Sequence, residues 1–263
     1  MNKILLYLPI VQWHGSVQRP QHLCFQAADF TVYHVHPTIN ANPPQLKETG
    51  YHNIYEYIPP IAPYPGRGLT ESNENILFEA ILSLIENANY ILIWVNSPYW
   101  FRLVRFLKSS NLKDKIDVAY DNLDIFEYFS DLIPFEAKLK EEHAAILELS
   151  DYIFYTSDHI RSHYNLPERS VQLLNACNPG DWLYNLECNF EESGLSGNYG
   201  YFGTIADWFD SDAIKQLSDS NTYKIDLIGH NSDHLKELSN VICHGPWAYC
   251  EIYEKARNWR LGL

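Results

Sequence analysis

Basic residues are scarce in this sequence of 263 residues, in which 19 lysines and arginines stand against 33 aspartates and glutamates. Nucleic-acid binding relies on Lys and Arg to displace counterions from phosphates, so a formal charge of −14 argues against a nucleic-acid partner. Long apolar runs are also lacking, since no segment reaches the roughly 20 apolar residues of a membrane span. The first apolar run, residues 3–11, has strand length and no cleavage site after it, so we interpret it as a buried strand rather than a signal peptide.

Closely spaced cysteine pairs are lacking as well. The five cysteines are widely spread and form no C-x-x-C motif; they are Cys24, Cys177, Cys188, Cys243 and Cys250. Such spacing predicts neither a disulfide framework nor a zinc site, and a reducing compartment is the simpler interpretation. The loop after the first strand is not a G-x-G-x-x-G fingerprint, because it holds a single glycine.

What the sequence does contain is typical of a parallel α/β protein. Hydrophobic residues make up 46% of the chain and aromatic residues 14%, which is enough for a packed core. Strand-like runs alternate with helical patterns, which indicates βαβ units. The predicted strands span residues 3–11, 30–37, 53–60, 89–98, 116–122, 151–157, 169–176, 197–205, 222–230 and 240–245. The predicted helices span residues 20–29, 71–87, 98–109, 135–149, 158–163, 210–218, 233–238 and 249–259.

A change in composition divides the chain. Residues 178–181 read Asn-Pro-Gly-Asp, and an acidic stretch rich in Gly and Ser follows at residues 187–198. We therefore predict a first domain over residues 1–180 and a second over residues 181–263. The second holds three predicted strands and the start of a fourth, which is short for a doubly wound domain.

The loop after the first strand is a candidate site, because ligands of open α/β sheets bind beyond the carboxyl ends of the strands. It offers backbone amides and polar side chains at the start of a helix. Its candidate substrate-binding residues are His14, Gly15, Ser16, Arg19 and Gln21. An ordinary strand-to-helix turn, with Pro20 at the first helical position, explains the same residues.

Further candidates follow later strands. Asp121 and Asp124 can orient a sugar hydroxyl or act as a base, although Asp is equally common as a helix N-cap at such a junction. Gly203 lets a ligand approach the backbone, and Thr204 with the amides after it suits a phosphate.

No metal site is predicted. The Asp-Ser-Asp stretch at residues 210–212 matches a metal-holding pattern, but the helix dipole explains two acids in a first helical turn. His34 and His36 fall on one face of a strand, yet no third ligand is identifiable and a structural role is the simpler interpretation.

The stretch at residues 97–115 predicts a basic, aromatic helix that starts with a Ser cap and Pro98. Arg102, Arg105 and Lys108 recur along it, so the helix can rest on anionic lipid at a membrane surface. The alternative is that its apolar side chains face the core and its charges are solvated.

Taken in order, these segments resemble the family-4-type glycosyltransferases of bacterial polysaccharide synthesis, particularly the teichuronic-acid-type group. The resemblance rests on seven stretches that cover nearly the whole chain: VQRPQHL, AYDNLDIF, EHAAILELSDYIFYTSDHI, LLNACNPGDW, GYFGTIADWFD, IDLIGH and NVICHGPWAYCEIYEKARNWRLGL. It implies a GT-B-like architecture of two facing Rossmann-like domains, which binds a nucleotide-sugar mainly through the second domain.

The resemblance also implies an activity, namely transfer of the sugar to an acceptor hydroxyl with retention of configuration and with no metal or other cofactor. The implied partners are the nucleotide-sugar and a saccharide or lipid-linked acceptor, in the cytoplasm or at the inner face of the membrane. On the acceptor side it implies the Arg19 loop and the catalytic candidates Asp121 and Asp124. On the nucleotide side it implies Gly203, Thr204, His230, Gly245, Pro246 and Trp247.

Relatives of this type usually carry an Asp where this chain has Arg260, and they continue beyond that segment. About 100 further residues would bring the second domain to ordinary size. The resemblance therefore implies that the second domain is incomplete, that the carboxylate which grips the donor sugar lies outside residues 1–263, and that these residues alone have weak activity or none.

Two alternatives stay open. One is a non-catalytic interaction protein, or a half-enzyme that dimerises or needs a complementing chain, because an interrupted sheet leaves an exposed edge. The other is a nucleotide-sugar epimerase of the same architecture. A transferase releases nucleoside diphosphate only with acceptor present, an epimerase needs no acceptor, and an interaction protein does neither.

Overall fold

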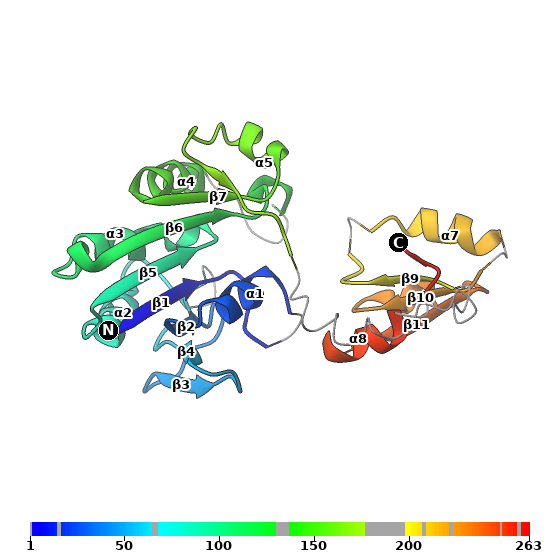
Figure 1. Cartoon of the computed structure of the whole chain (residues 1–263), viewed down its shortest axis with the longest axis horizontal. Helices are drawn as coiled ribbons and strands as arrows, with labels where there is room; N and C mark the ends of the chain where they lie inside the picture. Colours follow the sequence, from blue (N-terminus) through cyan, green and yellow to red (C-terminus); the bar gives the residue numbers. More distant parts are fainter. Residues whose placement is uncertain are drawn as a thin grey trace. The chain divides into compact units, whose positions relative to one another are not determined.

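The computed structural model describes residues 2–14, 17–64, 68–129, 137–176, 198–206, 209–220, 223–247, 249–256 and 259–263. The chain divides into two compact units, Met1–Cys177 and Asn178–Leu263. Each unit has its own sheet with helices packed against it (Figure 1).

The sheet of the first unit has eight strands in the order β3-β4-β2-β1-β5-β6-β7-β8. All neighbours are parallel except β3, which runs antiparallel to β4. The strands are β1 (Lys3–Leu8), β2 (Thr31–Val35), β3 (Gln45–Glu48), β4 (Ile54–Ile58), β5 (Tyr90–Val95), β6 (Ile116–Asn122), β7 (Tyr152–Tyr155) and β8 (Val171–Gln172).

Strand β1 shows why the central strands read as continuous apolar runs. It lies between β2 and β5, and its residues Ile4 to Leu8 are all buried. On one face Leu5 and Tyr7 pack toward Cys24 of α1, and on the other Ile4 and Leu6 join the core under α2 and α3. A parallel strand covered on both faces needs apolar side chains at every position rather than at alternate ones.

The helices of the first unit cover the two faces of this sheet (Figure 1). Helix α3 contacts both α2 and α4. The predicted start of the helix at residues 98–109 is confirmed, because the Ser97 hydroxyl accepts from Tyr99 N ahead of α3 and Pro98 opens the first turn. The helices are α1 (Arg19–Gln26), α2 (Glu74–Ile85), α3 (Phe101–Lys108), α4 (Ala137–Leu149) and α5 (Asp158–His163).

The second unit has a four-stranded parallel sheet in the order β11-β10-β9-β12. Its strands are β9 (Tyr199–Phe202), β10 (Ile225–Ile228), β11 (Val241–Gly245) and β12 (Leu261–Gly262), and its helices are α7 (Ser211–Asp219) and α8 (Tyr249–Ala256). The Asp210 side chain caps α7 by accepting from Ala213 N at 2.9 Å. The predicted helix at residues 233–238 is instead a single 3-10 turn, Ser232–Leu235.

A buried carboxylate ties the second unit together. Asp226 lies in β10 with no exposed surface, and it accepts from Asn198 Nδ2 at 3.0 Å and from Trp259 Nε1 at 3.1 Å. His244 Nε2 lies 2.7 Å from its other oxygen. Burial alone would raise the pKa of Asp226, but the bonds from His244 and Asn198 lower it below its ordinary value. One side chain of β10 thus bonds to the residue before β9, to β11 itself and to the segment before β12.

The predicted basic helix is α3 and the turns around it. Leu103, Val104 and Leu107 are buried against the sheet, so these apolar positions face the core. Arg102 pairs with Glu74 at 2.7 Å and Glu71 at 3.3 Å, and thus two acids neutralise part of its surface charge. No helix in the described residues has the length and hydrophobicity that crossing a membrane requires.

Candidate functional site

The carboxyl edge of the first sheet carries a buried ion pair that joins two predicted site residues. Arg19 opens α1, and Asp121 lies near the end of β6. The guanidinium donates from Nε to Asp121 Oδ2 at 2.9 Å and from Nη2 to Asp121 Oδ1 at 2.9 Å. The side chains are 8% and 0% exposed. Such a two-point contact fixes the orientation of both groups as well as their distance.

The remaining donors of Arg19 reach a third segment of the chain. Nη1 donates to the Leu173 carbonyl at 2.7 Å, to the Leu174 carbonyl at 3.0 Å and to Asn175 Oδ1 at 3.3 Å. Trp94 Nε1 adds a bond of 3.1 Å to Asp121. All three guanidinium nitrogens are therefore engaged within the protein, and Arg19 holds residues 173–175 against the start of α1.

A pocket of about 340 Å³ opens beside this ion pair. It lies beyond the carboxyl ends of β1, β5 and β6, which is where open parallel sheets bind ligands. Its lining combines apolar side chains with three amides and one carboxyl group. The lining residues are Ile10, Val11, Gln18, Arg19, Pro20, Asn96, Leu123, Asp124, Asn175 and Ala176.

The two carboxyl groups proposed as catalytic have different surroundings. Asp121 is fully buried in the ion pair, whereas Asp124 lines the pocket and makes no hydrogen bond or ion pair to a described residue. Partial burial raises the pKa of Asp124, and the nearby charge of Asp121 raises it further. Asp124 is therefore the carboxyl group of the pair that can meet a ligand.

Sequence reasoning missed Asn96, which follows β5 directly. Its side chain has no exposed surface and lines the pocket, and neither amide atom makes a hydrogen bond of good geometry to a described residue. Tyr7 lies beside it; burial raises the pKa of Tyr7 well above its ordinary value, and Asn96 has a small opposite effect. A polar residue directly after a buried strand was the available signal.

The other residues predicted in the first loop have separate places. Gln21 is buried and fixes the loop, because its Nε2 donates to the carbonyls of Gln12 at 3.2 Å and Trp13 at 3.0 Å. His14 is exposed and lies 3.7 Å from the buried Glu56. Gly15 and Ser16 lie outside the described residues.

His34 and His36 do not form a ligand pair. His34 is fully buried between the rings of Tyr7 and Trp13, whereas His36 lies 3.8 Å from Glu56. Among the described residues, no group of three His, Cys, Asp or Glu side chains is placed to hold a metal ion. Burial, with a smaller contribution from the neighbouring His36, lowers the pKa of His34 to about 3.

The lowered pKa of His34 predicts acid sensitivity in the first unit. Because the unfolded chain regains a His pKa near 6.5, it binds more protons than the folded chain between about pH 6.5 and 3, and stability falls as pH falls through that window. We expect the titration of His34 to lower the free energy of unfolding of the first unit by about 2 kcal/mol between pH 7 and pH 5. Urea unfolding at several pH values, with hydrogen exchange in β1 and β2 as the readout, measures this loss.

A His34→Phe variant keeps the aromatic contacts but removes the titrating group, so the loss of stability between pH 7 and pH 5 should shrink by about 2 kcal/mol. His52 is exposed, and His52→Phe is the matched control, which should keep the wild-type dependence. An unchanged slope in His34→Phe would show that another group controls the acid response.

In the second unit, a glycine stands at the carboxyl end of each of three strands: Gly203 directly after β9, Gly229 directly after β10 and Gly245 as the last residue of β11. Gly203 N donates to the Ile228 carbonyl at 3.0 Å, and Gly229 N donates to the Gly245 carbonyl at 2.9 Å. All three have positive φ angles, and the backbones approach so closely that a Cβ on Gly229 would lie 1.8 Å from the Gly203 carbonyl oxygen. At these three positions the edge presents backbone rather than side chains.

The residues predicted on the nucleotide side all lie at this edge. Thr204, His230 and Pro246 directly follow the three glycines and are exposed. Trp247 is 38% exposed and meets the ring of His244 edge-on at 5.6 Å. Because neighbouring parallel strands end at the same edge, these four residues lie with the predicted Gly203 and Gly245 at the carboxyl edge of the second sheet.

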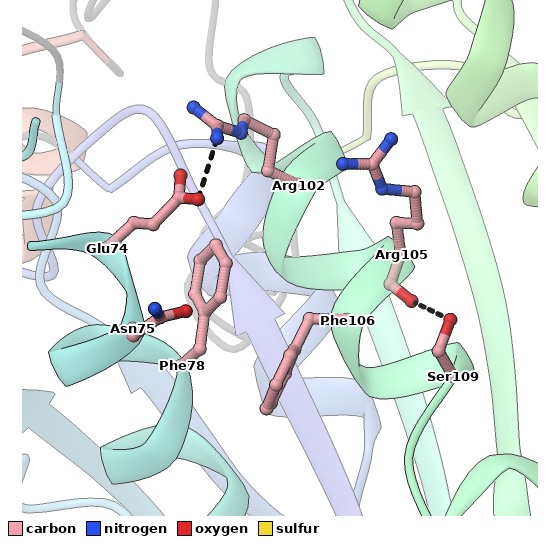
Figure 2. Close-up of a pocket in the computed structure, with 7 residues that line it drawn as sticks. All are labelled: Glu74, Asn75, Phe78, Arg102, Arg105, Phe106 and Ser109. Atoms are coloured by element: carbon pink, nitrogen blue, oxygen red, sulfur yellow. Dashed lines mark hydrogen bonds and ion pairs between the residues drawn. The ribbon is translucent and has the colours of Figure 1, made fainter. Parts of the chain in front are cut away.

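A second pocket, of about 280 Å³, lies between α2 and α3 (Figure 2). The rings of Phe78 and Phe106 lie 5.3 Å apart, and the Arg102–Glu74 ion pair lies across the gap between the helices. Arg105 lies over the ring of Phe101 at 5.2 Å. Every side chain that lines this pocket comes from the two helices or the cap of α3, so it belongs to the helix layer rather than to the carboxyl edge of the sheet.

No protein-family model matches the chain, and no curated protein matches it. Solved structures do match. Sucrose-phosphate synthase from Thermosynechococcus elongatus has a TM-score of 0.70 and 11% identity over 100% of this chain and 75% of its own. Anabaena HepE, in complex with UDP and glucose, has a TM-score of 0.67 and 14% identity over 100% of this chain and 73% of its own. The chain has the GT-B fold.

A third similar structure is the catalytic domain of starch synthase IV from Arabidopsis thaliana, bound to ADP and acarbose, with a TM-score of 0.59 and 9% identity over 99% of this chain and 77% of its own. These structures are GT-B glycosyltransferases. The predicted fold class, α/β and GT-B-like with mostly parallel sheets, is confirmed.

Proposed function

We propose that the chain is a glycosyltransferase that moves a sugar from a nucleotide-sugar to an acceptor hydroxyl. The observation that carries the proposal is the carboxyl edge of the second sheet, where three glycines expose backbone and Trp247 offers an aromatic surface. In a GT-B fold this edge is available to a nucleotide diphosphate. Two of the similar structures contain UDP or ADP, which supports a nucleotide as the ligand.

The first unit then takes the acceptor, in the pocket beside Arg19 and Asp121. Asp124 is the carboxyl group of this pocket that is free to orient an acceptor hydroxyl, and its raised pKa suits a group that accepts a proton. Asp121 and Arg19 act as positioning residues, since their polar atoms are engaged with each other. Retention of configuration, metal independence and a place in polysaccharide or glycolipid synthesis complete the proposal, and the family resemblance supports them.

Nucleotide binding tests the proposal directly. Calorimetric titration of the full chain with UDP and ADP should give saturable binding of at least one of them. Trp247→Ala should weaken that binding about tenfold, because stacking of a base on an aromatic ring is worth about 1–3 kcal/mol. Tyr152 of the first unit is similarly exposed, at 50%, and Tyr152→Ala is the matched control. Absence of binding in the wild type at millimolar nucleotide would contradict the proposal.

A further inference from the structure

We propose that the pocket of the first unit takes an uncharged, hydroxyl-bearing acceptor such as a saccharide, and that it discriminates against phosphate esters. This inference rests on the proposed function, in which that pocket holds the acceptor. It concerns the class of acceptor, which the fold alone leaves open, and it follows from the charges and free hydrogen-bonding groups that the pocket presents.

Among the described residues that line the pocket, no cation is free to bind a phosphate. Arg19 is the one cationic side chain among its described lining residues, and its donors are directed at Asp121, two backbone carbonyls and Asn175. Its charge is neutralised by the Asp121 carboxylate at 2.9 Å. Binding a phosphate through this guanidinium would require breaking a buried pair, which leaves Asp121 buried without a partner.

The charge that remains in the pocket is negative. Asp124 lines it without an ion-pair partner among the described residues. A dianionic phosphate ester would meet this carboxylate at short range, where like charges repel most strongly. A hydroxyl group, by contrast, donates a hydrogen bond to a carboxylate, and such charge-assisted bonds are stronger than neutral ones.

Neutral amides supply the rest of the polar lining. Asn96 is fully buried beside the Tyr7 hydroxyl, and neither of its amide atoms makes a hydrogen bond of good geometry to a described residue. An amide offers a donor and an acceptor side by side, which matches a hydroxyl that both donates and accepts. Leaving such a buried amide unpaired costs free energy, so a ligand that bonds to it gains affinity. Gln18 and Asn175 add two further amides.

The size of the pocket agrees with a small acceptor unit. Its volume of about 340 Å³ lies near the lower end of the range of about 300–1,000 Å³ for ligand pockets. Apolar side chains such as Ile10, Val11 and Leu123 complete the lining and suit the carbon faces of a sugar ring.

Titration of the full chain with glucose and with glucose 6-phosphate tests this inference. The indole N–H of Trp94 is a suitable NMR reporter, because it donates to Asp121 next to the pocket. We expect its signal to shift when glucose is added. The concentration of glucose 6-phosphate that gives the same shift should be at least ten times higher. Equal or tighter binding of the phosphate ester would overturn the inference.

Two variants distinguish the effect of the pocket on ligand preference from the effect of the overall negative charge of the protein. Asp124→Asn removes the local charge, so the preference for the neutral sugar should narrow to within about threefold. Asp158→Asn removes one negative charge from an exposed position of helix α5 and should leave the preference as in the wild type. If both variants change the preference equally, net charge rather than the pocket sets it, and the inference is wrong.

The same samples are also titrated with UDP and ADP. Nucleotide binding without any response to glucose would overturn the acceptor inference and leave the proposed function standing. Absence of both responses would contradict the proposed function as well.

Discussion

Asp121→Asn is expected to destabilise the first unit by about 3–5 kcal/mol. The substitution leaves the guanidinium of Arg19, whose side chain is 8% exposed, without its counter-charge. It also weakens the contact that holds Leu173 and Leu174 against α1, because Arg19 is then less firmly oriented. Urea unfolding followed by hydrogen exchange in β1 and β6 measures the change in the free energy of unfolding.

Asp124→Asn is the matched control, since the same chemical change three residues along removes a carboxyl group with no ion-pair partner in the described chain. We expect the Asp124→Asn variant to stay within about 0.5 kcal/mol of the wild type, as is usual for positions without a specific contact. Equal stability of the two variants would show that the Arg19–Asp121 pair does not hold the carboxyl edge together.

Gly229→Ala is expected to destabilise the second unit by more than about 4 kcal/mol, enough to unfold a marginal domain. A Cβ at this position would lie 1.8 Å from the Gly203 carbonyl oxygen, and no side chain can move to relieve a collision with backbone. The φ angle of +154° adds strain, because L side chains rarely adopt it. Loss of hydrogen-exchange protection in β9 and β10 is the expected observation.

Gly245→Ala separates the collision from the backbone strain. Gly245 also has a positive φ, of +72°, but a Cβ there meets no atom within 4 Å. The Gly245→Ala substitution should lower the free energy of unfolding through backbone strain alone, by about 1–2 kcal/mol. If Gly229→Ala costs no more than Gly245→Ala, the close approach of the β9 and β10 ends is not a constraint on the fold.

Much of this architecture could be predicted from the sequence, because buried parallel strands have a recognisable local pattern of residues. β1 from Ile4 on and the whole of β5 are continuous apolar runs of strand length between turns, and burial between neighbouring strands and helices is the reason for that composition. The edge strand β3 could not be found this way. Its residues Gln45–Glu48 are all exposed, so no hydrophobic pattern marks them, and pairing with β4 is what makes them a strand.

The candidate site was predictable in its positions but not in its contacts. Arg19 and Asp121 are both predicted, because Arg19 follows the loop after the first strand and Asp121 lies near the end of a strand. That they neutralise each other depends on a contact between residues 102 positions apart, which local patterns do not encode. The same limit applies to Asn96, whose significance comes from its burial beside the pocket and not from its neighbours in sequence.

The most direct test of the account is hydrogen exchange of the full chain with and without saturating UDP or ADP. The account predicts new protection in the backbone at residues 203–206, 229–231 and 245–247, where the three glycines end their strands, while residues 173–176 of the first unit stay as they were. Nucleotide binding that leaves those three segments unprotected, or that protects the pocket beside Arg19 instead, would contradict the assignment of the second unit to the nucleotide-sugar.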